Sequence, residues 1–405
     1  MKKILFLPLF QMPSGHHHVA DSLMDSIRKH SYKFECEKID FLHYVNPGLE
    51  KLVSSIYLKW IAASPSTYNK AYYHYSYTNS THNLSLSFYE KLFLRRMEKL
   101  ILEYDPDLIV CTHGFPSFLI SRLKEKGKIN NVPIINVYTD FFINSVWGIN
   151  GINYHLVPDH TIKSALVEKH GIPAKNIKIS GIPTHENLKT VQQAKSCENA
   201  YTIMIAGGSS GLGDIQGFLK ESLNQHFPVK FIILCGKNKH LYDDLSSWND
   251  PSIQVVPYIS SKEEMNLLYE QADAIVTKPG GVTISECLKK RVPIFVNSAL
   301  PGQEDVNLNV LLSKRLVYKL SKGKTYMEQI ISLLKNEKEM LQYQSRIDRY
   351  FSYLELTDSN SILSFISGVL KDEQQTGNIQ TVTEPYWTLL RELKHNSTLP
   401  ANDKT

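Results

Sequence analysis

A pair of glycines behind an apolar run is the first feature of this sequence that could do chemistry. Gly280 and Gly281 follow the strand-like run AIVT, and a helix is predicted to begin near Val282. The unpaired amides and positive end of a helix form a binding site for an anion such as phosphate. Glu286 lies one turn into that helix, where a carboxylate could accept hydrogen bonds from ribose hydroxyls. An ordinary strand, turn and helix with a surface glutamate is the competing interpretation.

A second glycine-rich loop, GGSSGLG, follows the predicted strand that ends at Ala206. Its spacing differs from the GxGxxG of dinucleotide-binding proteins, but it fits the GxSxG of hydrolases with Ser209 as the nucleophile. A hydrolase of that type needs a histidine near the end of the fold. The candidates are His226 and His240, which come too early, and His395, which lies in a polar tail. The loop therefore favours phosphate binding over hydrolysis.

Histidines follow the first predicted strand, in the sequence SGHHH. His16 opens a helix with an apolar residue at every fourth position, and we expect it to face the space between two domains. Because the pKa of histidine is close to neutral, His16 could remove a proton from an acceptor hydroxyl as a general base. The alternative is a helix-capping turn with exposed histidines.

Two patterns invite a metal-binding interpretation. Adjacent helical residues point about 100° apart, so His16, His17 and His18 do not converge on one ion, and the sequence shows no second ligand cluster. Asp105 and Asp107 form the DxD of metal-dependent sugar transferases, but they precede a strand. Ligands of parallel sheets bind beyond the opposite, carboxyl ends of the strands. The sequence therefore predicts no metal site.

The elements that must position these residues alternate between strands and helices. Strand-like runs occupy 3–10, 108–112, 134–138, 155–158 and 177–180, and then 203–206, 231–234, 253–256, 274–277 and 294–296. This alternation is typical of parallel sheets covered by helices on both faces. The sequence therefore predicts an α/β protein of two doubly wound domains, with ligands bound in a cleft between them.

The predicted boundaries divide the chain into five parts. They are an N-terminal domain at 1–185 with a helical insertion at about 50–104, a linker at 186–199, a C-terminal domain at 200–345, a helical segment at 346–370, and a polar tail at 371–405 with a helix at 386–394. The insertion and its end are rich in aromatic and basic residues, which are Tyr57, Trp60, Tyr72, Tyr73, Tyr75, Arg95 and Arg96.

Composition narrows the class of protein. With 405 residues, 42% of them hydrophobic and 21% charged, the chain can build two globular domains. No apolar run approaches the ~20 residues of a membrane span, and no cleavage site follows the first run, so we expect a cytoplasmic protein. The five cysteines are scattered without a CxxC, which indicates buried thiols. Residues 1–190 carry 22 Lys and Arg against 16 Asp and Glu, so the N-terminal half is basic.

Four further motifs accompany the glycine pair: KISGIPT at 178–184, CGKN at 235–238, SEC at 285–287 and PGQEDVN at 301–307. With TKPGG at 277–281, they make the chain resemble the processive diacylglycerol glucosyltransferases of Gram-positive bacteria and the plant monogalactosyldiacylglycerol synthases, from Lys2 to Leu320. The peptidoglycan N-acetylglucosaminyltransferase is a more distant relative. The resemblance implies a GT-B fold of two Rossmann-like domains, a UDP-sugar as co-substrate, and no cofactor.

The resemblance also implies which residues bind the donor. Backbone groups of the glycine pair and its neighbours would hold the diphosphate, and these residues are Gly280, Gly281, Val282 and Thr283, with Ser209 and Gly211 in the same pocket. Side chains would hold the rest of the donor, namely Tyr258 at the uracil, Glu286 at the ribose, Gln303 and Glu304 at the transferred sugar, and Asn307 in support of their loop. His16 matches the histidine of the family's GGH or NGH loop, the base or acceptor-orienting group.

Three positions depart from the family pattern. His185 stands where relatives carry an arginine, and Asn144 stands where a histidine is expected after Thr139 and Asp140. The N-terminal loop reads SGHHH. A histidine is only partly charged at neutral pH, so a clamp on the diphosphate is weakened. We assign His185, Asp140 and Asn144 to diphosphate or acceptor contacts.

The implied reaction is an in-line displacement at the anomeric carbon of UDP-glucose or UDP-galactose. Negative charge then builds on the departing diphosphate, where helix dipoles and amides can stabilise it without a metal. We therefore predict inversion at this carbon and no obligatory divalent cation.

The basic half and the aromatic-basic insertion favour a lipid acceptor, either diacylglycerol or a glycosyl-diacylglycerol. They also favour peripheral association with the anionic inner face of the cell membrane, and no nucleic acid partner is predicted. Packing of the tyrosines within a helical subdomain is the alternative for the insertion. A soluble small-molecule acceptor and a catalytically degenerate nucleotide-sugar-binding protein are the alternatives for the function.

Overall fold

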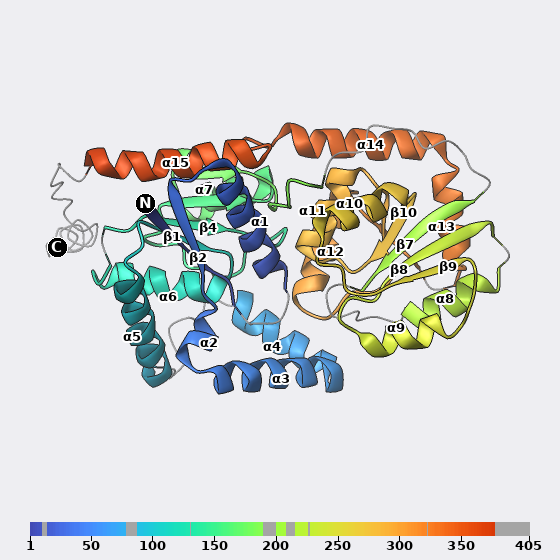
Figure 1. Cartoon of the computed structure of the whole chain (residues 1–405), viewed down its shortest axis with the longest axis horizontal. Coiled ribbons are helices and arrows are strands. Elements are labelled where there is room, and N and C mark those ends of the chain that lie inside the picture. The colour runs from blue at the N-terminus through green and yellow to red at the C-terminus, as the bar shows by residue number, and fades with distance from the viewer. Residues whose placement is uncertain are drawn as a thin grey trace, which may run out of the picture.

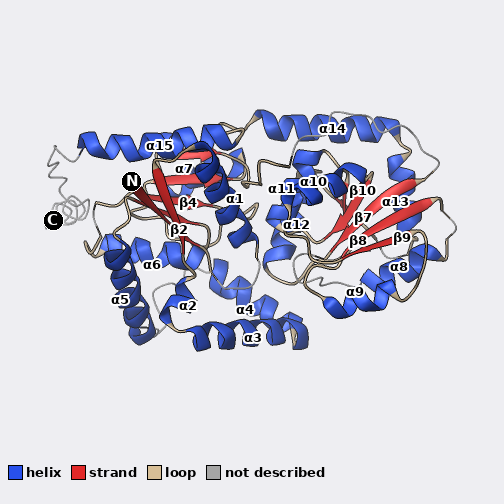
Figure 2. Cartoon of the chain, in the orientation of Figure 1, coloured by secondary structure: helices blue, strands red, loops and turns tan. Residues whose placement is uncertain are grey.

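The chain forms two six-stranded sheets, and every pair of neighbouring strands is parallel (Figures 1 and 2). The computed structural model describes residues 1–9, 14–77, 87–129, 131–188, 200–207, 215–225, 227–321 and 323–376. The N-terminal sheet runs, in spatial order, β2 (Phe34–Lys38), β1 (Lys2–Leu7), β3 (Leu108–Cys111), β4 (Ile134–Val137), β5 (Tyr154–Val157) and β6 (Ile177–Ile179). The C-terminal sheet runs β12 (Tyr318–Lys319), β11 (Ile294–Val296), β10 (Ala274–Thr277), β7 (Tyr201–Ala206), β8 (Val229–Leu234) and β9 (Ile253–Val256). The predicted α/β class with two doubly wound sheets is confirmed.

Helices flank both sheets. Those before the second sheet are α1 (Gly15–His30), α2 (Phe41–Val45), α3 (Pro47–Ala63), α4 (Pro65–Tyr77), α5 (Ser87–Tyr104), α6 (Gly114–Glu125), α7 (His160–His170) and the short η1 (Ala174–Asn176). Those that follow are α8 (Ile215–Leu223), α9 (Lys239–Ser246), α10 (Lys262–Gln271), α11 (Gly281–Lys290), α12 (Gln303–Ser313), α13 (Tyr326–Leu334), α14 (Glu337–Ser352) and α15 (Ser359–Thr376). In the described residues, no helix combines the length and the hydropathy that a membrane crossing requires.

All ten predicted strands are present, but the sequence pattern misses the edge strands β2 and β12. Only Cys36 is buried in β2, so this strand has no continuous apolar run, and β12 has only two residues. The first strand ends at Leu7 and not at Phe10, because Pro8 has no amide hydrogen with which to continue a ladder. Phe10, Cys197 and the predicted helix at 386–394 lie outside the described residues. The other four cysteines are buried thiols, as predicted.

The strands of the N-terminal sheet are buried on both faces. Ile4 and Phe6 of β1 pack with α1 on one face, whereas Leu5 and Leu7 pack with α5 and α6 on the other. Successive side chains of a strand point to opposite faces, so a strand covered on both faces must be apolar throughout. This is why the central strands can be predicted from the sequence and the edge strands cannot. The end of the predicted insertion, α5, belongs to this core.

The last two helices connect the domains. Figure 1 shows α14 along the C-terminal half of the molecule and α15 along the N-terminal half. The Tyr343 hydroxyl of α14 donates to the carbonyl oxygen of Val292 at 3.0 Å, and the ring of Phe365 in α15 meets Tyr154 of β5 edge to face at 5.3 Å. The chain therefore returns to its first domain after completing its second. The predicted boundary at residue 345 falls inside α14.

The two domains approach each other closely where α11 begins. A methyl group added at Gly281 would lie 2.0 Å from the carbonyl oxygen of Thr139, which follows β4 in the other domain. A methyl group added at Gly15, the first residue of α1, would lie 3.1 Å from Cγ2 of Val282. The first turns of α1 and α11 therefore meet at the domain interface, and only glycine fits at the closest point.

Replacing either member of the glycine pair tests this contact. Gly281→Ala should lower the free energy of unfolding by about 1–3 kcal/mol, because the added methyl group forces the Thr139 backbone away. Gly280→Ala is the matched control, since its added methyl group would meet nothing within 4 Å, and it should cost less than about 1 kcal/mol. Thermal unfolding followed by circular dichroism measures both. Equal shifts in Tm would contradict the close approach.

Candidate active site at the domain interface

His16 lies in the first turn of α1 with its ring fixed from the N-terminal sheet. Its Nδ1 is 2.9 Å from the carbonyl oxygen of Thr112 and 2.8 Å from Oγ1 of Thr139. A carbonyl oxygen can only accept, so Nδ1 carries the hydrogen and Nε2 keeps its lone pair. Burial lowers the pKa of His16 to about 4, so the ring is neutral at neutral pH. A neutral ring with a free Nε2 can accept a proton, but a pKa of about 4 lies below the near-neutral value expected from the sequence and makes the ring a weaker base.

A second histidine, His113, lies against His16 and is missed by the sequence analysis. The two rings meet edge to face, with centroids 4.5 Å apart. The Nδ1 of His113 accepts a hydrogen bond from the Phe115 amide at 3.0 Å and so caps α6, and burial holds its pKa well below the usual value. The sequence offered one sign of this residue, which is its position. THG follows β3 just as SGH follows β1, and because β1 and β3 are neighbours, their following loops lie side by side.

The first turn of α11 presents amides without side-chain caps. Gly280 occupies the N-cap position and has no side chain to accept hydrogen bonds from the turn. The neighbouring helices α9 and α10 are capped instead, by the side chains of Asn238 and Ser261. The amides of the first turn of a helix lack intrahelical partners, so this end of α11 is suited to an anion. Gly280, Gly281, Val282 and Thr283 form this turn, where the sequence placed the diphosphate.

Glu286 lies on the same helix as this turn and is partly buried. The Tyr269 hydroxyl donates to its Oε2 at 2.9 Å, which orients the carboxylate. Burial raises the pKa of Glu286. The charge of Lys262 lowers the pKa of both Glu286 and His18 of α1. Glu286, the residue predicted to bind the ribose, therefore feels the same lysine charge as the first turn of α1.

Asp140 joins the domains through the side chains of two residues of α12. Its Oδ1 accepts a hydrogen bond from Nδ2 of Asn307 at 2.7 Å, and its Oδ2 accepts one from Nε2 of Gln303. Asn307 in turn accepts from the Phe141 amide at 2.9 Å. Burial raises the pKa of Asp140 to about 6, although both amide donors act in the opposite direction. Gln303, one of the two residues predicted to contact the sugar, and Asn307, predicted to support their loop, are thus bound to the N-terminal domain.

Glu304 is paired with a buried lysine that the sequence analysis did not single out. Its Oε2 accepts a hydrogen bond from the Leu300 amide at 2.6 Å, and its Oε1 lies 4.0 Å from Nζ of Lys278. Burial raises the pKa of Glu304 and lowers that of Lys278, so each charge depends on the other for compensation. Lys278 is the lysine of TKPGG. A positively charged residue so close to the glycine pair could have been recognised from the sequence as part of the site.

The remaining predicted site residues in the described ranges contact groups other than His16 and the first turn of α11. His185 lies 3.6 Å from Asp25 of α1, its pKa is lowered by burial, and its carbonyl accepts from Lys289. Asn144 donates to the Tyr72 hydroxyl at 3.4 Å. Tyr258 is exposed beyond β9, with Nζ of Lys237 5.2 Å from its ring centroid. Ser209 and Gly211 lie outside the described residues, as do the side chains of Tyr57 and Tyr75.

The DxD pair lies where the sequence predicts, at the amino end of β3. Asp107 binds the Lys2 ammonium at 2.6 Å and the Lys3 amide at 2.8 Å, both at the start of β1. Within the described ranges, no three His, Cys, Asp or Glu side chains gather as ligands for a metal ion.

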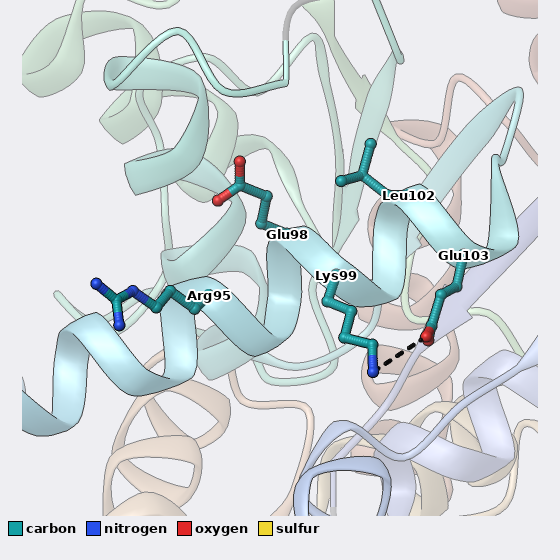
Figure 3. Close-up of a pocket in the computed structure, with 5 residues that line it drawn as sticks. All are labelled: Arg95, Glu98, Lys99, Leu102 and Glu103. Carbon is teal, nitrogen blue, oxygen red and sulfur yellow. Dashed lines mark ion pairs between the residues drawn. The ribbon is translucent and has the colours of Figure 1, made fainter.

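A hollow on the surface of α5 lies apart from these residues (Figure 3). Its lining comes from a single helix, and Lys99 and Glu103 form an ion pair within it at 3.4 Å. Glu98 is 3.6 Å from Lys128, and Leu102 is 72% exposed. The hollow is a charged helix surface whose carboxylates are already paired, and none of the predicted site residues lines it.

Solved structures share the arrangement of the two sheets. The crystal structure of MurG from Acinetobacter baumannii has a TM-score of 0.58 at 12% identity, over 91% of this chain and 100% of that one. CalG4, the calicheamicin glycosyltransferase, has a TM-score of 0.58 at 10% identity, over 94% of this chain and 99% of that one. The two parallel sheets, each in its own Rossmann-like domain, define the GT-B fold.

Sequence relatives narrow this class. Residues 16–184 match the family described as monogalactosyldiacylglycerol (MGDG) synthase, and residues 202–346 match the glycosyltransferase family 28 C-terminal domain. A Bacillus subtilis (strain 168) protein, the uncharacterized glycosyltransferase YkoN, is 41% identical over 86% of this chain and 93% of its own length. The processive diacylglycerol beta-glucosyltransferase of Bacillus pumilus is 26% identical over 84% of this chain and 88% of its own length. The chain belongs to the same glycosyltransferase family as YkoN, carries a family 28 C-terminal domain, and is related to the diacylglycerol glucosyltransferases.

Asp140→Asn tests how far the buried charge of this carboxylate lowers the stability of the protein. Burial raises the pKa of Asp140 from 3.8 to about 6, so between these values the folded protein binds a proton that the unfolded chain does not. Stability from this group is therefore present near pH 4 and is lost as the pH rises to about 6. Asparagine does not titrate, so the Tm of the variant relative to wild type should rise across this window and stay level above it. Thermal unfolding at a series of pH values measures the difference, and one that does not vary with pH would contradict the assignment.

Proposed function

We propose that this protein transfers a hexose from UDP-glucose or UDP-galactose to a lipid acceptor, either diacylglycerol or a glycosyl-diacylglycerol, with inversion and without a divalent cation. The observation that carries the proposal is the meeting of α1 and α11. The uncapped first turn of α11 lies beside the turn that carries His16, because Gly15 and Val282 are in contact range. This contact supports the proposal because it brings a helix terminus that is suited to an anion close to a neutral histidine of the other domain.

The reaction uses these groups in a single displacement. Nε2 of His16 takes the proton of the acceptor hydroxyl as its oxygen forms the new bond to the anomeric carbon. The bond from that carbon to the diphosphate oxygen breaks on the opposite face, so the configuration inverts. The negative charge that collects on UDP is stabilised by the amides of the α11 turn and the positive end of its helix dipole.

Two substitutions separate turnover from donor binding. His16→Ala should lower kcat by about 10²–10⁴-fold and leave the Kd for UDP unchanged, because it removes only the base. Glu286→Ala should weaken UDP binding by about tenfold or more, because a ribose hydroxyl loses its charged acceptor. Transfer assays in EDTA and titration calorimetry with UDP measure the two effects.

Exposed variants provide the controls for this pair. His240→Ala and Glu264→Ala change the same residue types on exposed helices and should behave like wild type. A wild-type protein that ignores UDP and UDP-sugars would overturn the proposed function. UDP binding without transfer to any acceptor would instead favour the degenerate sugar-nucleotide-binding protein, which the substitutions at His185 and Asn144 also motivate.

The lipid acceptor is supported by an apolar stripe on α3. Leu52, Ile56 and Trp60 recur at every fourth position, so they share one face of the helix, and they are 57%, 55% and 41% exposed. Lys51 and Lys59 are exposed beside them. An amphipathic helix of this kind suits an anionic bilayer, where apolar side chains insert and lysines meet headgroups. We propose peripheral association with the inner face of the cell membrane through this stripe.

Charge placed in the stripe tests the membrane association. The double variant Leu52→Glu, Ile56→Glu should lower the fraction that co-sediments with phosphatidylglycerol-containing liposomes by about tenfold, because it replaces apolar contact with repulsion. Leu341→Glu is the control, because this leucine is 73% exposed on α14 of the other domain. The membrane proposal is rejected if the wild type does not bind the liposomes. It is also rejected if binding changes neither with salt nor in the double variant, and either result favours a soluble acceptor.

A further inference from the structure

The hairpin of α3 and α4 reaches across the interface to the turn before α12. Gly302 is buried at this turn, with φ 87° and ψ −115°, a region that is open to glycine and strained for other residues. A methyl group added there would lie 3.0 Å from Cε1 of Tyr68 and 3.0 Å from Cγ of Tyr72. Two rings of α4 therefore lie directly on the backbone of a turn that belongs to the other domain.

These two rings are supported by further contacts from their own domain. Tyr68 is only 9% exposed and meets the edge of Trp60 of α3 at a centroid distance of 5.6 Å. The hydroxyl of Tyr72 accepts a hydrogen bond from Nδ2 of Asn144 at 3.4 Å. Figure 1 shows α3 and α4 as a hairpin that lies along one edge of the molecule and extends toward the C-terminal domain. The rings thus form a fixed surface rather than a pair of isolated contacts.

The turn under this surface carries the two side chains proposed to contact the sugar. Gln303 and Glu304 follow Gly302 directly, as the first residues of α12. We infer that Tyr68 and Tyr72 are positioning residues for the sugar end of the donor site, because they hold the Gly302 turn in place. The inference rests on the proposed function, and it gives the helical insertion a role in donor recognition as well as in membrane association.

The arrangement separates the two ends of the donor. The uridine and diphosphate ends are assigned to Glu286 and to the first turn of α11, and neither is among the groups that α4 contacts at Gly302. Displacement of the turn should therefore weaken binding of the sugar and leave binding of UDP intact. A loss of folding would instead lower the active fraction, and hence kcat, without changing either affinity.

Substitutions of Tyr72 test the inference. Tyr72→Ala should raise the KM for the UDP-sugar by about tenfold, since a small misplacement of binding groups has a large effect, while the Kd for UDP stays at the wild-type value. Tyr72→Phe keeps the ring and should restore the wild-type KM. His74→Ala removes an exposed ring from the same helix and is the matched control. The kinetics use detergent-solubilised diacylglycerol, so that membrane association does not enter, and calorimetry gives the Kd for UDP.

Each outcome bears on the inference. A Tyr72→Ala protein with unchanged KM, or with KM and the Kd for UDP raised together, overturns it. If Tyr72→Ala does not fold, Tyr72→Leu preserves most of the buried bulk and the same comparison applies. If the wild type is active and Tyr72→Ala has the wild-type KM, only the positioning role is rejected. If the wild type binds neither UDP nor UDP-sugar, the proposed function is rejected as well.

Discussion

The contact between the Thr139 carbonyl and Gly281 is the constraint on which the site depends. The backbone of one domain approaches the first turn of α11 so closely that no side-chain atom fits between them. The same short segment carries two other contacts, because the Thr139 hydroxyl meets His16 and the next residue, Asp140, binds Gln303 and Asn307. One loop after β4 therefore sets the distances among His16, the first turn of α11, and the side chains of Gln303 and Asn307.

The interface also disfavours charge on its own side chains. Burial lowers the pKa of His16 and Lys278 and raises the pKa of Asp140, Glu286 and Glu304, which are all shifts toward the neutral form. Helix termini differ from these groups because their partial charges do not titrate. The α11 turn can therefore meet a diphosphate without first releasing or binding a proton.

Much of this arrangement could be predicted from the sequence, for identifiable reasons. Central strands buried on both faces leave continuous apolar runs, and the glycine pair marks a point where the backbones of the two domains lie close together, so the sequence predicts both the fold and the α11 turn. The edge strand β2 was missed because only Cys36 in it is buried. The partnership of Asp140 with Asn307, and of Tyr72 with Gly302, joins residues 167 and 230 positions apart in opposite domains. No local pattern reports such pairs. His113 and Lys278 were overlooked although each follows directly on a predicted strand.

The return of α15 to the first domain has a consequence for synthesis on the ribosome. Phe365 and the nearly inaccessible Ile366 belong to the surface that closes over Tyr154 and α1, so the first domain emerges with part of its apolar face bare. That face stays uncovered until the whole second domain and α14 have been translated. The nascent chain must therefore keep an exposed hydrophobic surface soluble while the second domain is synthesised, and a chain released before α15 lacks the helix that covers this surface.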